Sequence, residues 1–594
     1  MIRKPLRPLA LVLEARAAGQ NPKDIERENI RARQEQARDA SRSRAESRLL
    51  VLLLTFLSLF GLVAFQMGVL ALSDASEPTS SYSGPSIVAQ RGNIVDREGR
   101  ILATNIDTYS LYATPQDMVD PEMAAKGLVE IFPELEEQDL LRWFTGKRKF
   151  LWVKKKLSPE QKQAVQDLGE PGLKFGPREL RLYPNGSLAA HVLGGASFGR
   201  EDVAAAEVVG VAGVEKTFDD FLRDPARAGE PLQLTIDLSI QSAVERVLQG
   251  GMTLMNAKGA AAILMDVNTG EIVSLVSLPD FDPNERPPLP TSGSPTDSPL
   301  FNRAVQGVYE LGSTFKIFAA AQAIDLGLVT PDTMIDIRGP LKWGKFRITD
   351  FKNYGNELSV YDIIKKSSNI GTARLALQIG AERQQDFLRA LGFDEKTSVE
   401  MVEAKGGKPK WPSDWQDIST ITVSYGHGIS VTPMHLAAGY ATLANGGYRV
   451  TPTLLKQDYP QRGPRVISPE TSRQVREMLR AVVKEGTATF GDVEGYAVGG
   501  KTGTADKAKE NGGGYYEDRV ISTFASVFPA YDPKYVLIVT MDEPELATEI
   551  EPKRTAGWTA VPIAAEIITR VAPLLGLRPE IEPKPQTGVT GASN

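Results

Sequence analysis

Residues 309–316 read Tyr-Glu-Leu-Gly-Ser-Thr-Phe-Lys, so that Ser313 precedes Lys316 by three positions. The apolar, alanine-rich run Ile317–Leu326 follows and ends at Gly327, which predicts a turn that leads into a buried helix. Side chains three positions apart share a helix face, so Lys316 can take the proton of the Ser313 hydroxyl. The unpaired N–H groups at the helix start can stabilise charge beside Ser313. The pattern predicts a serine nucleophile with a lysine base, a pair that needs neither histidine nor metal.

Two more motifs follow this pair, which alone is a weak signal because Ser-x-x-Lys recurs by chance in a chain of 594 residues. Ser367–Asn369 reads Ser-Ser-Asn, and Lys501–Thr504 reads Lys-Thr-Gly-Thr. In isolation, Asn369 would be interpreted as a helix cap and Lys501–Thr504 as an exposed turn. The three motifs in this order are the set of penicillin-binding proteins and class A β-lactamases. The chain therefore resembles the penicillin-binding transpeptidases.

Acyl transfer needs a nucleophile, a base and an oxyanion hole, and the motifs offer a candidate for each. Ser313 is the predicted nucleophile and Lys316 its base. Lys316 must then be neutral part of the time, which burial and a second cation would favour, and Lys501 is the candidate for that cation. Ser367 can relay a proton to the leaving amine. The backbone N–H groups of Ser313 and Thr504 can form the oxyanion hole.

The same motifs predict the substrate contacts. Asn369 can bind the substrate amide, and the hydroxyls of Thr502 and Thr504 can bind a terminal carboxylate. Gly503 has no Cβ, so its strand can approach a ligand closely. The predicted substrate-binding residues are Asn369, Lys501, Thr502, Gly503 and Thr504.

The resemblance implies a peptidoglycan D,D-transpeptidase. Ser313 would attack the D-Ala-D-Ala end of a stem peptide and release D-Ala, and an amine of a neighbouring stem would take the acyl group. β-Lactams mimic that end and acylate the same serine. Leu311 stands where the family often has Pro, which should affect the turn rather than the chemistry. No segment resembles a glycosyltransferase domain, so class B is implied, and the residues around Ser313 and Tyr425–Leu436 resemble the division-specific, FtsI-type branch.

Three further motifs resemble the membrane-proximal pedestal of class B penicillin-binding proteins. They are Arg91–Ala103, Arg181–Gly186 with His191, and Gly213–Glu215. The first reads as two short strands around the turn Asp96–Gly99. We interpret all three as structural turns and buried polar contacts in a non-catalytic module, with His191 a structural residue rather than an acid–base catalyst.

The composition excludes several classes of protein. A net charge of −6 gives no general case for nucleic-acid binding. Without cysteine there are no disulfides and no thiolate metal sites. The three histidines, His191, His427 and His435, lack the spacing of a metal-binding pair on a helix. We expect no cofactor and no metal.

The N-terminal region predicts one membrane span. Met1–Arg48 is a polar, arginine-rich tail, and Leu49–Leu72 has no charged residue. At about 1.5 Å per residue this run can cross a bilayer core. The arginines precede it, so the tail should stay in the cytoplasm. Ala71–Ser73 loosely resembles a signal-peptidase site, but the run exceeds the usual apolar segment of about 7–15 residues, which favours an uncleaved anchor.

A chain of this length needs more than one core. We predict a cytoplasmic tail over 1–48, a transmembrane helix over 49–72, a β-rich pedestal over 73–230, a transpeptidase domain over 231–577 and a disordered tail over 578–594. The fold class is α+β, with a central antiparallel sheet wrapped by helices. A helix capped by Ser239 should precede that sheet, and Ala505–Arg519 should form a mobile loop whose Tyr515 or Tyr516 closes over substrate. The predicted sheet strands are Ala260–Met265, Glu271–Val276, Val498–Thr504, Thr523–Phe528 and Tyr535–Met541, closed by a helix over Ala556–Leu575.

The resemblance also implies partners and a location. These are peptidoglycan stem peptides, β-lactams, a SEDS-family (FtsW-type) glycosyltransferase and other division proteins. The protein would be a single-pass protein of the inner membrane, with its catalytic domain in the periplasm, at the division septum. An elongation-type class B enzyme, a membrane-anchored β-lactamase and a non-enzymatic β-lactam sensor are the alternatives.

Overall fold

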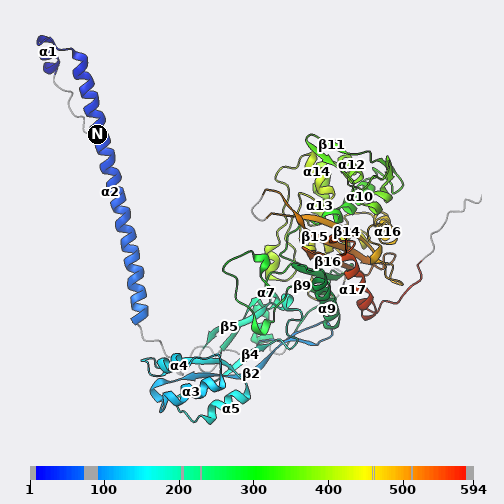
Figure 1. Ribbon diagram of the computed structural model, residues 1–594, viewed down its shortest axis with the longest axis horizontal. Helices are drawn as coiled ribbons and strands as arrows, with labels where there is room; N and C mark the ends of the chain where they lie inside the picture. The colour runs from blue at the N-terminus through cyan, green and yellow to red at the C-terminus, as the bar shows by residue number, and fades with distance from the viewer. Residues whose placement is uncertain are drawn as a thin grey trace, which may run out of the picture. The chain divides into compact units, whose positions relative to one another are not determined.

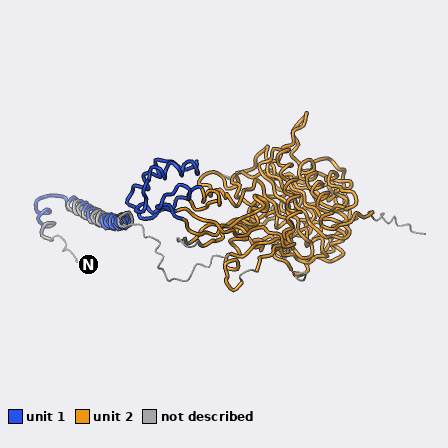
Figure 2. The backbone as a smooth tube through the Cα atoms, turned by 90° about the horizontal axis from the view of Figure 1, so that it is seen from below, with its two compact units in different colours: residues 1–79, 112–153, 164–174 blue, residues 80–111, 154–163, 175–594 orange. Residues whose placement is uncertain are grey.

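The chain forms two compact units, seen in the computed structural model of Figure 1 and coloured separately in Figure 2. The first comprises residues 1–79, 112–153 and 164–174, and the second comprises residues 80–111, 154–163 and 175–594. The structure describes residues 9–72, 91–201, 206–227, 230–457, 459, 462–509 and 513–582. Most of the predicted C-terminal tail therefore lies outside the described residues.

The first unit contains the N-terminal helices α1 (Leu9–Ala17) and α2 (Pro22–Leu72). Within α2, Leu49–Met67 is the one stretch of the described chain that is long and apolar enough to cross a membrane, and its side chains are exposed. This agrees with the predicted anchor. The unit also holds α3 (Pro121–Ile131) and α4 (Glu137–Phe144), which pack on each other through small and apolar side chains. These side chains are Ala124, Ala125, Leu128, Leu140 and Phe144.

All three pedestal motifs lie in the second unit, two of them at strands and the third at the start of α7. The sheet order is β3-β2-β1-β7, with β4 paired to β2, while β5 and β6 form a separate antiparallel hairpin. β2, β3 and β4 each begin or end in the first unit. The bounds are β1 (Ile94–Val95), β2 (Ile101–Ala113), β3 (Leu151–Leu157), β4 (Leu173–Leu182), β5 (Gly195–Glu201), β6 (Ala206–Ala212) and β7 (Leu232–Gln233), with α5 (Pro159–Asp167), α6 (Ala190–Leu193), α7 (Gly213–Thr217) and α8 (Asp219–Arg223).

The three pedestal motifs converge on one buried carboxylate. Glu215 is fully buried and accepts hydrogen bonds from Arg91 Nε at 2.7 Å, Arg181 Nε at 2.6 Å and the Tyr183 hydroxyl at 3.2 Å. The predicted turn is also present, since the Gly99 N–H donates to the Asp96 carbonyl. His191, the fourth pedestal candidate, is buried beside Phe281 with its Nε2 3.2 Å from the Pro279 carbonyl oxygen. These contacts fit the structural interpretation of the motifs.

Replacing Glu215 with alanine is expected to destabilise this unit strongly. The variant would leave the buried Arg181 without a carboxylate and would take one of two carboxylates from the buried Arg91, which keeps Asp219. Breaking a buried ion pair typically costs about 3–5 kcal/mol. Urea unfolding of the full chain followed by circular dichroism measures the loss. The exposed neighbour Asp220 gives the control, because Asp220→Ala should change the free energy of unfolding by less than about 0.5 kcal/mol. Equal stability of the two variants would contradict a structural role for the cluster.

The catalytic part is built on a five-stranded antiparallel sheet of order β14-β15-β16-β8-β9. Nearly every residue of β8, β9 and β16 is buried, so helices cover both faces, as the α+β prediction requires. α9 and α17 pack on each other and on the sheet, whereas α15 and α16 pack on each other and on the sheet, and α10 packs on α16. The strand bounds are β8 (Gly259–Asp266), β9 (Ile272–Leu278), β14 (Gly499–Ala508), β15 (Tyr515–Phe528) and β16 (Tyr535–Asp542).

The helices of this part are mostly where the sequence predicts them. α17 begins four residues later than predicted, and α9 is capped by Asp237, which accepts from the N–H groups of Ser239 and Ile240, so the predicted Ser239 cap is wrong. Small strands pair as β10 with β13 and β11 with β12. The helix bounds are α9 (Leu238–Leu254), α10 (Lys316–Asp325), α11 (Val360–Lys366), α12 (Asn369–Ile379), α13 (Ala381–Ala390), α14 (Asp417–Ser424), α15 (Pro433–Ala444), α16 (Pro469–Glu485) and α17 (Ala560–Leu574), and the small strands are β10 (Met334–Asp336), β11 (Leu341–Trp343), β12 (Phe346–Ile348) and β13 (Glu357–Ser359).

The predicted loop Ala505–Arg519 is wrong for most of its length. β14 continues to Ala508 and β15 starts at Tyr515, with Ala505 paired to Ile521 and Asp506 to Val520. The two strands form one long hairpin. Its tip is short, and residues 510–512 of it lie outside the described residues.

Candidate active site

Ser313 lies on a 3₁₀ turn, Gly312–Phe315, that runs directly into α10 at Lys316. Residues three apart eclipse each other in a 3₁₀ turn, so Ser313 and Lys316 face the same side. Gly312 has a φ of 55°, a left-handed conformation that glycine adopts without strain. Ser313 is half-buried between fully buried neighbours, while Lys316 is only 1% exposed. The predicted nucleophile is thus more accessible than the predicted base.

The Lys316 ammonium is held by the second motif. Its Nζ donates to the Ser367 carbonyl at 2.6 Å and lies 3.0 Å from Ser367 Oγ. Burial, and next the neighbouring Lys501 cation, lower the pKa of Lys316 well below its usual range, against the opposing effect of the Asp350 carboxylate. Lys316 therefore loses its proton at a lower pH than an exposed lysine does.

Lys501 approaches the same serine from the sheet. It is fully buried on β14, and its Nζ lies 3.0 Å from Ser367 Oγ and 3.1 Å from the Thr502 carbonyl oxygen. Burial lowers its pKa to about 7. Ser367 Oγ thus lies between two buried amines, one from α10 and one from the sheet, which is the arrangement a proton relay needs.

The third motif packs directly against the serine turn. A Cβ at Gly503 would lie 2.2 Å from the Leu311 carbonyl oxygen, and a Cβ at Gly312 would lie 3.0 Å from the Thr504 carbonyl oxygen. Glycine at 503 therefore lets the strand reach the turn, and the backbones of Ser313 and Thr504 belong to segments in contact. Each threonine hydroxyl already has a partner in the chain. Thr502 Oγ1 lies 2.7 Å from Thr487 Oγ1, and Thr504 Oγ1 accepts from the Ala556 N–H at 3.0 Å.

The structure adds one residue to the second motif that the sequence analysis missed. The Asp350 carboxylate accepts from the Ser368 hydroxyl at 2.7 Å, the Asn369 N–H at 2.6 Å and the Ile370 N–H at 3.0 Å. It thereby holds the start of α12 and leaves Ser367 in a left-handed conformation with φ 62°. Ser367 ends α11 and turns its hydroxyl toward the two amines.

The cap interpretation of Asn369 is wrong, because Ser368 caps α12 through a hydrogen bond from the Gly371 N–H. The side-chain amide of Asn369 donates instead to the Thr349 carbonyl at 2.8 Å. Its Oδ1 remains the atom that would accept from a substrate amide. Asn369, like Ser367, is half-buried.

Glu310, three residues before Ser313, was also missed. It accepts from the Gly428 N–H at 3.0 Å and from the Tyr515 hydroxyl at 3.1 Å, so it joins the serine turn to a glycine-rich loop and to the hairpin. Tyr515 was considered only as part of a mobile lid. Burial, and next the Glu310 carboxylate, raise its pKa to about 12, so it stays protonated and donates. No local sequence signal marks either contact, because the partners are about 118 and 205 residues apart.

The described residues include no group of three or more histidine or acidic side chains placed to hold a metal ion. The side chains of the three motifs are amines, hydroxyls and one amide. Such a set supports acyl transfer to and from a serine.

Comparisons with known proteins give relatives for nearly the whole chain. The penicillin-binding protein transpeptidase domain model matches residues 260–569, and the penicillin-binding protein dimerisation domain model matches residues 86–226. The probable peptidoglycan D,D-transpeptidase FtsI of Caulobacter vibrioides is 33% identical, over 92% of each chain. Penicillin-binding protein PbpB of Mycolicibacterium smegmatis is 31% identical, over 87% of this chain and 88% of its own. Crystal structures of penicillin-binding protein 3 from Mycobacterium tuberculosis with aztreonam and with ampicillin are similar at TM-scores of 0.63 and 0.64 and 27% identity, covering 83% and 84% of this chain and 98% of theirs.

Proposed function

Because this chain belongs to the class B penicillin-binding proteins, we propose that Ser313 is the residue that carries the acyl group in its D,D-transpeptidase reaction. The enzyme acts on peptidoglycan and is a target of β-lactams. The observation that carries the site assignment is the hydrogen-bonded set Lys316–Ser367–Lys501. Ser313 is assigned to this set because residues three apart face the same side of a 3₁₀ turn, which aligns Ser313 with Lys316. Three motifs that are far apart in the sequence meet there.

Acylation follows from this geometry. Neutral Lys316 takes the proton of the Ser313 hydroxyl while Ser313 Oγ attacks the carbonyl carbon of the penultimate D-Ala. The oxyanion is stabilised by the N–H groups of Ser313 and Thr504, each donor typically worth about 3 kcal/mol. When the peptide bond breaks, Ser367 passes its proton to the departing D-Ala amine and takes up the proton that Lys316 received from Ser313. The Lys501 cation and the hydroxyls of Thr502 and Thr504 hold the terminal carboxylate.

In the second half-reaction the same groups transfer the proton in the opposite direction. An amine of a neighbouring stem peptide attacks the ester carbonyl, and its proton returns through Ser367 and Lys316 to Ser313 Oγ as the ester bond breaks. A new peptide bond cross-links the two stems, and the free serine is restored. With a β-lactam the ring amide opens, no leaving group departs, and the ester persists.

Mass spectrometry of the penicillin-treated full-length protein tests the assignment. We expect a single adduct on the peptide that contains Ser313. The adduct should be long-lived, since the sequence has no motif that supplies the deacylating Glu of class A β-lactamases. Rapid release of hydrolysed penicillin over many turnovers would instead support the β-lactamase alternative.

Asp350 is proposed as a positioning residue for the second motif. Asp350→Ala removes the acceptor of three hydrogen bonds from the residues that directly follow Ser367, so the acylation rate should fall by about 10–100-fold. Asp350→Asn keeps one acceptor oxygen and should retain more activity. Because the carboxylate raises the pKa of Lys316, its removal should also shift the acidic limb of the pH–rate profile to lower pH. Lys352→Ala is the control, and an unshifted profile in Asp350→Asn would contradict the role.

The remaining proposal concerns location and partners. The apolar stretch of α2 supports an anchor, and the arginine-rich residues before it support a cytoplasmic N-terminus with the second unit in the periplasm. FtsI names among the relatives support a role at the division septum, together with an FtsW-type glycosyltransferase. A fluorescent fusion should gather at midcell in dividing cells, and a lateral-wall pattern would favour the elongation alternative.

Topology has a direct test. The test uses a reporter enzyme that is active only outside the cytoplasm. Fused after Ser76, the reporter should be active, whereas fused after Arg48 it should be inactive. Alkaline phosphatase activity in cells measures both fusions. Activity of the Arg48 fusion together with silence of the Ser76 fusion would reverse the orientation and remove the active site from its substrate.

A further inference from the structure

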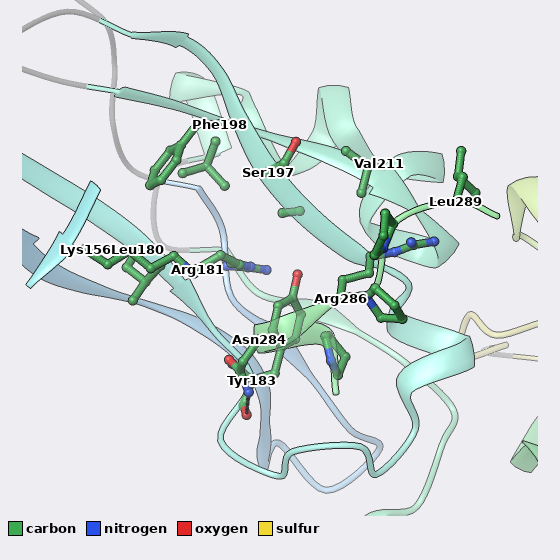
Figure 3. Close-up of a pocket in the computed structure, with 15 residues that line it drawn as sticks. Lys156, Leu180, Arg181, Tyr183, Ser197, Phe198, Val211, Asn284, Arg286 and Leu289 are labelled. Carbon is green, nitrogen blue, oxygen red and sulfur yellow. Dashed lines mark hydrogen bonds between the residues drawn. The ribbon is translucent and has the colours of Figure 1, made fainter. Parts of the chain in front are cut away.

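A cavity of about 400 Å³ lies in the second unit, away from the active-site residues. Its walls come from β4, the β5–β6 hairpin and the segment Pro283–Leu289 (Figure 3). In the sequence this segment precedes Ser313. The volume of the cavity is in the range of small-molecule sites, typically about 300–1,000 Å³. Asn284 links the two sides, because it accepts from the Tyr183 N–H at 3.0 Å and donates to the Tyr183 carbonyl at 2.9 Å. The cavity is thus a built feature of the packed unit.

One part of the cavity wall is apolar. Leu180, Phe198 and Val208 line it, and Val211 and Leu289 line it as well although they are 44% and 74% exposed. An apolar wall with exposed apolar side chains favours an apolar group as occupant, since burial stabilises by about 25 cal/mol per Å². If water alone filled the cavity, this apolar surface would stay hydrated.

The other part of the wall is cationic. Lys156, Arg181 and Arg286 line the cavity, and no acidic side chain does so among the residues that the structure describes. Arg181 is 5% exposed, and its Nη2 has no hydrogen-bond partner although its Nε is paired with Glu215. In Figure 3 the Arg181 guanidinium points from β4 toward the middle of the lining residues, beside the Tyr183 hydroxyl.

Arg286 is a second arginine of the wall and is half-buried. Its Nε donates to the Gly194 carbonyl at 3.2 Å, and burial lowers its pKa against the attraction of Glu403. Arg181 Nη2, by contrast, is a buried guanidinium donor without a partner, and such a donor is costly unless an anion or other acceptor is supplied. Arginine also binds carboxylates with two parallel hydrogen bonds.

We infer that this cavity is a binding site for a small amphipathic carboxylate. The apolar body of the ligand packs against Phe198, Val208 and Leu289, and its carboxylate accepts hydrogen bonds from Arg181 or Arg286. The site shares no residue with the Ser313 centre. Its occupant contacts both the β5–β6 hairpin and the Pro283–Leu289 segment, so it would hold those two parts together.

Matched ligands test the charge requirement. The full-length protein in lipid nanodiscs is titrated with 2-naphthylacetate and with 2-naphthylacetamide, which has the same shape and no charge, and empty nanodiscs give the background. Ligand-observed NMR should show saturable binding of the acid and at least about ten-fold weaker binding of the amide. No saturable binding of the acid, or equal binding of acid and amide, would overturn the inference.

Matched variants test whether the ligand binds in this cavity. Arg286→Gln should weaken naphthylacetate binding about ten-fold, and Ala196→Trp, which fills the cavity, should abolish it. Lys155→Gln, on the strand position next to Lys156, should bind as the wild type does. Penicillin labelling of Ser313 should be unchanged in all three variants, which confirms that they fold.

Two results would count against the site. Naphthylacetate binding that is unaffected by Ala196→Trp and Arg286→Gln places the ligand elsewhere. Binding of acetyl-Phe-Asp-Leu-amide without binding of naphthylacetate would assign the cavity to an acidic segment of a partner protein and overturn the small-ligand inference.

Discussion

Ser313→Ala is expected to abolish covalent penicillin labelling and stem-peptide cross-linking together. Under the proposed assignment the variant removes the atom that takes the acyl group, and loss of a serine nucleophile costs on the order of 10⁶-fold in rate. The fold should survive, because Ser313 is only half-buried and the turn is set by Gly312 and its buried neighbours. Gel fluorescence with a labelled penicillin and a cross-linking assay with purified stem peptides measure the two activities.

The control for this variant is Ser294→Ala, a serine-to-alanine change in the loop that precedes the motif. It should label and cross-link normally. An adduct on another residue of the wild type, or residual cross-linking by Ser313→Ala, would refute the assignment of the whole site. Loss of activity with a lowered melting temperature would point to a folding defect, so circular dichroism accompanies each assay.

Lys316→Met should reduce acylation by about 10²–10⁴-fold, the usual contribution of a general base. Methionine fills a similar volume without the amine, and Lys316 is almost fully buried, so packing is preserved. In the wild type the acylation rate should fall as the pH is lowered through the pKa of Lys316, because only the neutral amine accepts a proton. That pKa is depressed mainly by burial, so the rate should persist well below the ordinary lysine range.

Stopped-flow acylation rates across pH measure both effects. The exposed Lys342 provides the matched control, and Lys342→Met should behave as the wild type. Normal penicillin labelling by a folded Lys316→Met variant would remove this lysine from the mechanism. A wild-type rate that fell through an unshifted lysine pKa would contradict the proposed tuning.

Local pattern predicted much of this architecture. The buried helix predicted over Ile317–Leu326 is present as α10, one residue earlier at each end, and the five predicted strands of the catalytic sheet are all present. Hydrophobic periodicity and turn residues depend on only a few neighbouring positions, so they predict helices and strands without knowledge of the tertiary structure. The convergence of three motifs on one site came from resemblance.

The errors lie where tertiary contacts override the local pattern. Glycine and polar residues predicted a loop over Ala505–Arg519, but cross-strand pairing with the neighbouring strand extends the hairpin through most of it. Asp350 belongs to no sequence motif. It contributes to the site only because the fold brings it to the start of α12, about 19 residues later in the chain. Glu310 and Tyr515 meet for the same reason.

The close approach of Gly503 to Leu311 limits how resistance can evolve. Any other residue at 503 would place a Cβ 2.2 Å from the Leu311 carbonyl oxygen and push the strand away from the serine turn. A mutation there that excluded an antibiotic would also impair the cell's own wall synthesis, so selection under drug pressure should discard it. Resistant lineages should instead accumulate changes in side chains around the site and leave this glycine unchanged.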